Sequence, residues 1–183
     1  YFEDLENEKF FTFIHFYDPH QPYTPPYPYN NRYKDNPYDG EIAFTDEMVG
    51  KMLEWFEDEG FLDNTLVILT SDHGEGFNEH GLTGHGHFLY ETTQHVPLIF
   101  WCPGLIPDGK VIDEQVRLID IVPTLIDILG IEQSIEMDGV SLVDALIRGD
   151  TIENLPSYCE SYNCYYQFGW SRLLGLSNGE WKY

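Results

Sequence analysis

Residues 65–75 read Thr65-Leu66-Val67-Ile68-Leu69-Thr70-Ser71-Asp72-His73-Gly74-Glu75, an apolar run followed at once by polar and ionisable side chains. A short apolar run bounded by such residues is typical of a buried strand. Asp72 and His73 follow it directly, at the carboxyl end where open α/β sheets place their ligand crevices. A carboxylate oxygen and an imidazole nitrogen at this place can converge on one cation. The pattern therefore predicts that Asp72 and His73 form half of a divalent metal site.

The preceding residues predict a strand and a helix. Residues 10–16 are aromatic and apolar without helical spacing, which indicates a buried strand. From Asp39, an expected N-cap, apolar side chains recur at three- and four-residue steps until Gly60. This spacing predicts an amphipathic helix of about five turns. The strand at 10–16, this helix and the strand at 65–70 follow one another in an order that predicts a right-handed parallel unit. Pro97–Trp101 is expected to be a further strand.

The second half of the chain predicts two more helices and then a change of architecture. Ile119–Leu129 is expected to be a helix with Pro123 in its first turn, and Ser141–Ile147 a short helix capped by Ser141. From Leu155 onward, segments rich in Tyr, Trp and Leu predict short strands, with a hairpin turn at Asn178-Gly179. The strands are expected at 157–162, 172–177 and 180–183. We therefore expect one α/β domain over residues 1–150 and a small antiparallel subdomain over residues 151–183.

Composition and charge exclude several classes of protein. The 183 residues include 32 acidic and 9 basic side chains, with a formal net charge of −23. A nucleic-acid-binding surface needs clustered Lys and Arg, so nucleic acid is not an expected partner. No stretch approaches the ~20 apolar residues of a transmembrane helix, so no membrane span is expected. Because this charge repels an anionic substrate, binding of such a substrate requires a local cation together with His or Lys side chains.

The three cysteines are Cys102, Cys159 and Cys164, and their spacing shows no Cys-x-x-Cys metal pattern. We expect free, partly buried thiols, because free cysteine commonly behaves as a small apolar residue. A disulfide between Cys159 and Cys164 is the alternative.

Several segments resemble, in order and spacing, the sulfatases of the alkaline phosphatase superfamily. They are Tyr17-Asp18-Pro19-His20-Gln21-Pro22-Tyr23, Thr70-Ser71-Asp72-His73-Gly74-Glu75, Glu79-His80-Gly81-Leu82, Val96-Pro97-Leu98-Ile99, Asp120-Ile121-Val122-Pro123-Thr124-Leu125 and Asp138-Gly139-Val140-Ser141-Leu142. The resemblance implies an α/β fold with a mostly parallel sheet flanked by helices and a small antiparallel carboxyl-terminal sheet. It also implies hydrolysis of a sulfate ester, on a sulfated carbohydrate or an aryl sulfate.

The resemblance further implies one divalent metal, with Ca²⁺ the usual ion of the family. Histidine is a poor Ca²⁺ ligand, so His73 leaves Mg²⁺, Mn²⁺ or Zn²⁺ open. Many relatives are exported, which favours the periplasm or the exterior. The sequence does not indicate the substrate or the oligomeric state.

The nucleophile of these sulfatases is a formylglycine made from the Cys or Ser of a Cys/Ser-x-Pro/Ala-x-Arg motif, which lies near the amino terminus with two metal-binding aspartates. None of the three cysteines here has an Arg two residues after a Pro or Ala. We therefore expect the chain to be the carboxyl-terminal portion of such an enzyme, inactive alone, with the formylglycine in the missing amino-terminal part.

Three histidines are candidates for contact with the substrate. By resemblance, His20 in Pro19-His20-Gln21-Pro22 hydrogen-bonds the sulfate or protonates the leaving oxygen, work that suits a group titrating near neutral pH. Many sulfatases place a sulfate-binding lysine in the segment that here reads Gly84-His85-Gly86-His87, and this chain has no lysine between Lys51 and Lys110. Either His85 or His87 is expected to take its place, with His87 narrowly favoured.

Two alternatives remain beside the sulfatase. Phosphodiesterases, phosphonate hydrolases and phosphoryl transferases of the same superfamily also place Asp-His and a later His around a metal. A catalytically inactive protein that binds sulfated glycans is the non-enzymatic alternative, because the aromatic loop Tyr17–Tyr38 suits stacking on sugars.

Overall fold

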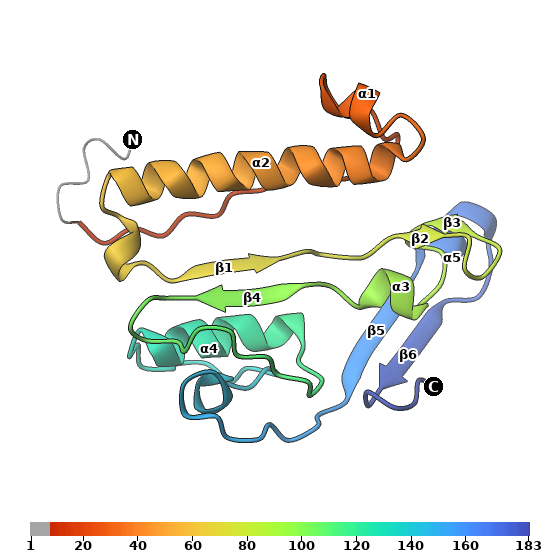
Figure 1. Ribbon diagram of the computed structural model, residues 1–183. Coiled ribbons are helices and arrows are strands. Elements are labelled where there is room, and N and C mark those ends of the chain that lie inside the picture. Colours follow the sequence, from red (N-terminus) through yellow and green to blue (C-terminus); the bar gives the residue numbers. More distant parts are fainter. Residues whose placement is uncertain (1–7) are drawn as a thin grey trace. The chain divides into compact units, whose positions relative to one another are not determined.

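The computed structural model describes residues 8–183, and the chain divides into two compact units, one ending at Phe61 and the other running from Leu62 to Tyr183 (Figure 1). Each unit is described by itself. The expected boundary between residues 150 and 151 falls inside the second unit and stays a prediction. The helices of the described residues are too short or too polar to span a membrane.

The first unit is built on the helix α2 (Pro37–Asp58). Pro37 occupies the first helical position, where its missing N–H costs nothing, and Asn36 is the residue before it. The prediction of Asp39 as N-cap is wrong by about one turn, since Asp39 lies inside the helix and accepts a hydrogen bond from Asn36 Nδ2 at 2.6 Å. An acidic side chain in the first turn still stabilises the helix through its dipole.

The predicted end of α2 is confirmed. Gly60 has a φ of +74°, which a residue without Cβ adopts at little cost. The N–H groups of Gly60 and Phe61 donate to the carbonyl oxygens of Glu57 and Phe56, each at 2.9 Å. This is the hydrogen-bond pattern that closes many helices.

A proline-rich loop precedes α2 and packs on its first turns. The short helix α1 (Tyr29–Arg32) buries Tyr29, whose ring lies 5.8 Å from that of Phe44. A Cβ at Gly40 would lie 2.8 Å from Pro25 Cγ, so the loop fits there because residue 40 is a glycine.

The prediction of a buried strand at residues 10–16 is wrong. The segment has no regular secondary structure, and the side chains of Phe11 and Phe13 are 82% and 81% exposed. A strand requires hydrogen bonds to a neighbouring strand, and no strand in the described residues pairs with this segment.

The second unit begins with η2 (Leu62–Asn64) and contains β1 (Val67–Thr70) and β4 (Leu98–Trp101), which lie side by side (Figure 1). Both predicted strands are confirmed. They pair antiparallel, with Val67 opposite Trp101. Every sheet of the described residues is a two-stranded antiparallel one, so the predicted parallel unit does not form there, because its first strand is missing.

The residues between β1 and β4 fold back on themselves. A small hairpin joins β2 (Gly76–Phe77) to β3 (Thr83–Gly84), with Gly76 opposite Gly84, and α3 (Glu91–Gln94) follows. The hairpin returns the chain at residue 84 to the level of residue 76. His85 is thereby brought near the residues that follow β1.

The helix α4 (Ile121–Ile128) follows η3 (Leu118–Asp120), and Pro123 lies in its first turn, as predicted. The Asp120 side chain is almost fully buried and accepts hydrogen bonds from Arg117 Nη2 at 2.7 Å and from the Val140 N–H at 2.9 Å. Asp120 therefore ties the start of α4 to the segment before η4.

The predicted helix Ser141–Ile147 is one π-helical turn, η4 (Asp144–Arg148). Ser141 is not its N-cap, because the turn begins three residues later and the Ser141 hydroxyl donates instead to Asp127 Oδ2 at 2.5 Å. Leu142, Ala145 and Leu146 are buried and form the apolar contacts of this segment.

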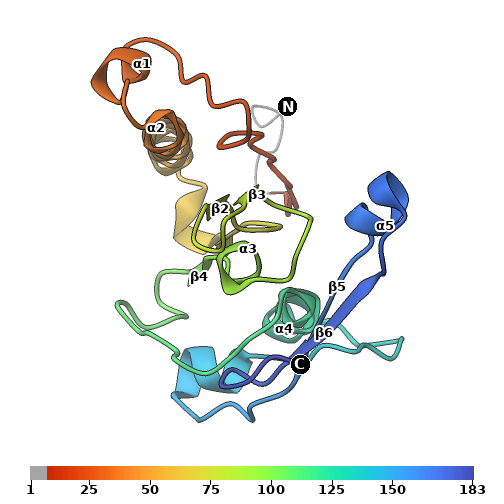
Figure 2. The same ribbon diagram turned by 90° about the vertical axis from the view of Figure 1, so that its right-hand side faces the viewer.

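The carboxyl-terminal residues form a hairpin of β5 (Ser157–Ser161) and β6 (Leu173–Ser177), with α5 (Asn163–Phe168) at the far end of the hairpin (Figure 2). The two strands and the turn at Asn178-Gly179 are confirmed, and Gly179 has a φ of +87°. The strand predicted at 180–183 is reduced to a bridge between Ser177 and Lys182.

The cysteines are free thiols, as expected, and Cys164 is buried. Burial also raises the pKa of the Cys159 thiol.

Candidate functional site

Asp72 and His73 follow β1 directly, as the sequence predicts. His73 Nδ1 lies 2.9 Å from the carbonyl oxygen of Gly74. A carbonyl oxygen only accepts hydrogen bonds, so Nδ1 carries the proton and the lone pair of the neutral ring is on Nε2. His73 Nε2 lies 3.8 Å from Asp72 Oδ1, and the Asp72 side chain is 77% exposed.

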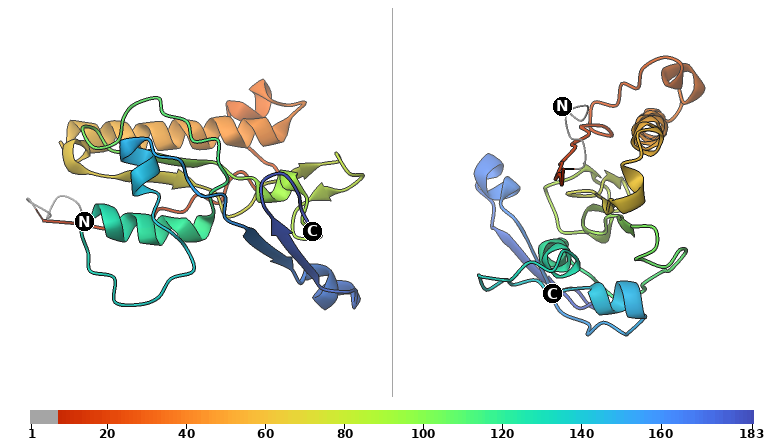
Figure 3. Two further views of the ribbon diagram at one scale, coloured as in Figure 1. Left: turned by 90° about the horizontal axis from the view of Figure 1, so that it is seen from below. Right: turned by 90° about the vertical axis from the view of Figure 1, so that its left-hand side faces the viewer.

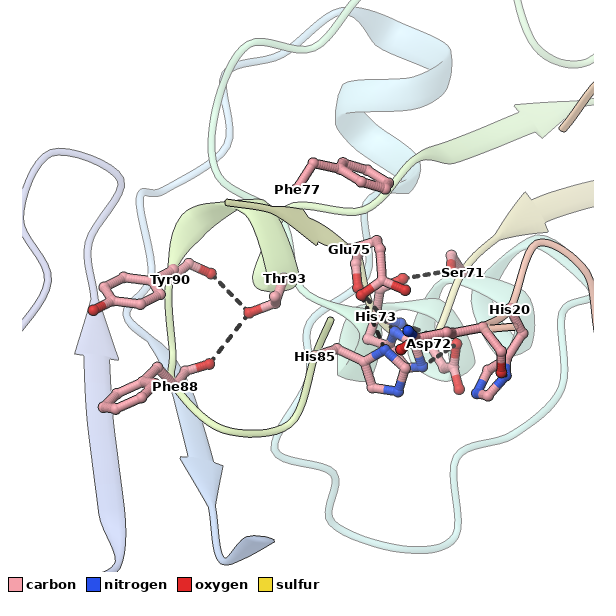
Figure 4. A network of polar contacts seen from close by, with 12 residues as sticks. His20, Ser71, Asp72, His73, Glu75, Phe77, His85, Phe88, Tyr90 and Thr93 are labelled. Atoms are coloured by element: carbon pink, nitrogen blue, oxygen red, sulfur yellow. Dashed lines mark hydrogen bonds and ion pairs between the residues drawn. The ribbon is translucent and has the colours of Figure 1, made fainter. Parts of the chain in front are cut away.

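The ring of His85 stacks on that of His73, with ring centroids 3.9 Å apart (Figure 4). His85 Nδ1 lies 3.2 Å from Glu75 Oε1, and the Glu75 side chain is only 6% exposed. The carboxylate accepts from Nδ1–H and fixes the orientation of the ring. The structure therefore brings His73, His85 and Glu75 together, with Asp72 beside them.

The backbone around these side chains is fixed by Gly74 and Thr93. The Gly74 N–H donates to the carbonyl oxygen of Thr93 at 3.1 Å, and a Cβ at Gly74 would collide with the carbonyl oxygen of Thr92. The Thr93 hydroxyl donates to the carbonyl oxygens of Phe88 at 3.3 Å and Tyr90 at 3.0 Å (Figure 4). Hydrogen bonds of Thr93 thus hold the loop on both sides of His85, at Gly74 before it and at Phe88 and Tyr90 after it.

His87 lies apart from the stacked pair. Its ring is 6.3 Å from that of Phe168 on α5, and its carbonyl oxygen accepts from Cys164 Sγ at 3.6 Å. His85 and His87 both line a pocket of about 20 Å³, which has room for a water molecule and not for a sugar.

His20 belongs to the first unit. Its backbone N–H donates to Glu41 Oε2 at 3.0 Å, and the N–H of Thr24 donates to Glu41 Oε1 at 2.5 Å. Glu41 is the fifth residue of α2 and is 1% exposed. The ring nitrogen Nδ1 of His20 lies 2.7 Å from the carbonyl oxygen of Gln21, so this nitrogen carries a proton and Nε2 points away from that contact.

Two donor atoms of this chain fit a divalent cation. Metal–ligand bonds of about 2.0–2.4 Å allow one ion to contact both Asp72 Oδ1 and His73 Nε2, which are 3.8 Å apart. The hydrogen bond from His73 Nδ1 to a backbone carbonyl is the usual support of a metal-binding histidine. Within residues 8–183, no three His, Cys, Asp or Glu side chains form a group able to hold a metal ion. By themselves, Asp72 and His73 are two donor side chains and not a complete metal-binding group.

Glu75 and Glu41 hydrogen-bond the candidate histidines, and the sequence did not single out either glutamate. Glu75 stands in the motif after β1, and Glu41 two residues after the expected N-cap. The sequence signal that could have pointed to them is an acidic side chain within a segment expected to pack against the rest of the protein. A buried carboxylate needs a hydrogen-bond or charge partner, so such a glutamate is expected to contact another polar group.

Comparison with known proteins identifies the family. A family model described as Sulfatase matches residues 2–131, and the chain belongs to the sulfatase family. It is 31% identical over 150 residues to arylsulfatase K of Danio rerio, across 80% of this chain and 28% of that protein. It is 35% identical over 109 residues to an N-acetylglucosamine-6-O-sulfatase of Bacteroides thetaiotaomicron, across 60% of this chain and 19% of that protein.

Solved structures show the same fold. One protein, whose structure was solved in complex with its substrate D-glucosamine-2-N,6-O-disulfate, matches with a TM-score of 0.66 and 29% identity, over 82% of this chain and 31% of that one. The phosphonate monoester hydrolase of Agrobacterium radiobacter matches with a TM-score of 0.70 and 29% identity, over 81% of this chain and 32% of that one. The chain therefore spans less than a third of the length of these relatives.

Proposed function

We propose that the protein is a metal-dependent sulfuric ester hydrolase that acts on a sulfated carbohydrate. The observation that carries this proposal is the pair of stacked histidines, His73 and His85, beside Asp72 at the end of β1. The choice of a carbohydrate is supported by two relatives, one named as an N-acetylglucosamine-6-O-sulfatase and one whose structure was solved in complex with a sulfated glucosamine.

In this proposal Asp72 and His73 would hold one divalent ion through Oδ1 and Nε2. The ion would supply positive charge for an anionic sulfate, which the net charge of −23 otherwise repels. The proton on His73 Nδ1 is donated to the Gly74 carbonyl oxygen, which fixes the ring and would leave the lone pair of Nε2 available to the ion.

His85, rather than His87, takes the place of the family lysine. The stacking of His85 on His73 puts its ring beside the proposed metal ligands, whereas the ring of His87 faces Phe168. Glu75 holds the proton on His85 Nδ1 and directs Nε2 toward the sulfate. For His20, the proposed role is protonation of the leaving oxygen, and this role rests on its motif Pro19-His20-Gln21-Pro22.

The remaining metal ligands and the formylglycine are proposed to lie in a part of the protein outside these residues. Two observations support this: the chain lacks the formylglycine motif, and it offers no complete metal-binding group in its described residues. The mostly parallel sheet is proposed to form there as well. Residues 1–183 alone are then expected to release no sulfate.

Phosphonate ester hydrolysis is the second candidate, favoured by the likeness to the phosphonate monoester hydrolase. Sulfate and phosphonate monoesters are both tetrahedral anions, so the same cation and histidines can bind either group.

The test is an assay of the full-length protein, purified with its native metal. Sulfate release from N-acetylglucosamine 6-sulfate and phenol release from phenyl phenylphosphonate are measured with and without EDTA. The proposal predicts faster turnover of the sulfate ester and loss of activity in EDTA. Faster turnover of the phosphonate selects the second candidate, and tight binding of sulfated sugar without turnover of either ester selects the inactive glycan-binding protein.

A further inference from the structure

An aromatic patch stands open on α5 and the residues that follow it. It consists of Tyr165, Tyr166, Phe168 and Trp170 together with Arg172. Tyr166 is 77% exposed, and Phe168 and Trp170 are each 55% exposed. Figure 3 shows α5 at the tip of the β5–β6 hairpin, the end opposite to the Asn178-Gly179 turn. Large exposed apolar groups gathered in one place are a mark of a binding surface.

The backbone under the aromatic patch is held in one conformation. Cys164 is buried, and Gly169 ends α5 with a φ of +68°. The Gly169 N–H donates to the carbonyl oxygen of Tyr165 at 3.0 Å, and the Trp170 N–H donates to that of Cys164 at 3.2 Å. The rings of Phe168 and Trp170 lie 5.4 Å apart at 42°. The rings are therefore arranged before any ligand binds, which lowers the entropic cost of binding.

A cation lies within the aromatic patch. The guanidinium of Arg172 lies 4.9 Å from the centroid of the Tyr165 ring and 5.3 Å from that of Tyr162. The Arg172 side chain also hydrogen-bonds the side chains of Tyr165 and Tyr162 and is exposed, so its positive charge is held in place at the surface, where an anionic group can approach it. In a chain with 9 basic and 32 acidic residues, this is a local site for a negative charge.

The aromatic patch adjoins the loop that carries His85 and His87. The Ser161 hydroxyl donates to the carbonyl oxygen of Gly86, and Cys164 Sγ donates to that of His87. The rings of Phe168 and His87 are nearly parallel, at 18°. The aromatic patch therefore lies beside the part of the loop that carries His87.

We propose that the aromatic patch is a sugar-binding subsite for the carbohydrate part of the substrate. The faces of a pyranose ring carry C–H bonds with partial positive charge, which pack on the negative faces of Tyr166, Phe168 and Trp170. Arg172 binds a second sulfate or carboxylate group on a neighbouring sugar. With this subsite, the substrate class is an anionic oligosaccharide rather than a small aryl sulfate. The inference rests on the proposed function, because it extends the proposed sulfatase site.

The test uses the full-length protein and an array of sulfated and desulfated hexosamine and galactan oligosaccharides, followed by fluorescence titration with the best-retained saccharide. Trp170→Ala is expected to weaken binding at least about tenfold, and Trp170→Phe to restore most of it. Trp181→Ala is the matched control and is expected to bind like wild type, because Trp181 is exposed (64%, against 55% for Trp170) but lies at the opposite end of the hairpin. Arg172→Gln is expected to weaken only the binding of saccharides with two or more anionic groups.

The results separate this subsite from the proposed hydrolysis. Sulfate release by wild type together with an unchanged KM in Trp170→Ala overturns the subsite and leaves the hydrolase intact. Saccharide binding that depends on Trp170 in a protein without sulfatase activity keeps the subsite and overturns the hydrolase. Wild-type protein that retains no saccharide on the array, or that shows the aromatic patch covered by another protein chain, contradicts the subsite.

Discussion

His85 and His20 are each held by a buried glutamate, but the two glutamates act on different parts of the histidine. In the second unit, Glu75 contacts the ring of His85 at 3.2 Å. In the first unit, Glu41 accepts hydrogen bonds from the main-chain N–H groups of His20 and Thr24. The ring of His20 instead contacts the carbonyl oxygen of Gln21. Glu75 therefore fixes the orientation of the His85 ring and keeps a proton on its Nδ1, whereas Glu41 fixes the backbone of the loop that carries His20. Removal of Glu75 should therefore affect catalysis first, and removal of Glu41 should affect stability first.

The largest effect is expected at His85 itself. His85→Ala in the full-length protein should lower kcat for sulfate release about 10³-fold, because a group that stabilises charge on the sulfate is lost. His85→Lys should retain much of the activity, since relatives use lysine in this segment. His87→Ala is the control and should stay within about threefold of wild type. Steady-state kinetics check this, and a larger loss in His87→Ala than in His85→Ala would reverse the assignment.

The second effect concerns Glu41. Glu41→Ala leaves two N–H groups without their buried acceptor, and each such loss costs about 1–3 kcal/mol, so the free energy of unfolding should fall by about 3 kcal/mol. Glu41→Gln keeps one accepting oxygen and should cost about 1 kcal/mol. Urea unfolding measures both variants. Equal stability of Glu41→Ala and wild type would show that the loop is held by other contacts.

The smallest of these effects is expected at Glu75. Glu75→Gln keeps an oxygen that accepts from His85 Nδ1–H but loses the negative charge, so kcat should fall about tenfold. The midpoint of unfolding should change little, in contrast to Glu41→Ala. If Glu75→Gln instead lowers stability and leaves kcat unchanged, Glu75 is a structural residue and the comparison with Glu41 fails.

The sequence predicted the elements that depend on local pattern. The strands at β1 and β4, the end of α2 at Gly60 and the place of Pro123 in α4 all follow from side chains close together in the chain. The wrong N-cap predictions at Asp39 and Ser141 have a local cause as well. The first helix begins with Asn36 and Pro37, and the second begins after Val143.

Features that depend on distant residues were not predictable in the same way. Residues 10–16 have the composition of a strand, but a strand forms only where a partner is available. Asp72, His73 and His20 were singled out from their motifs, whereas the motif left His85 and His87 open and narrowly favoured His87. The contact between His85 and Glu75 was not predictable, because it depends on the β2–β3 hairpin, which returns the chain to the end of β1.

The most direct test of the proposed metal site is the metal content of the full-length protein, measured by inductively coupled plasma mass spectrometry beside that of Asp72→Ala and His73→Ala. The two residues supply adjacent donor atoms, 3.8 Å apart, so one divalent ion per wild-type chain is expected, with strongly reduced occupancy in both variants. A matched exposed control, Asp144→Ala, should keep the ion. Full occupancy in Asp72→Ala and His73→Ala, with sulfate release unaffected by EDTA, would contradict the account.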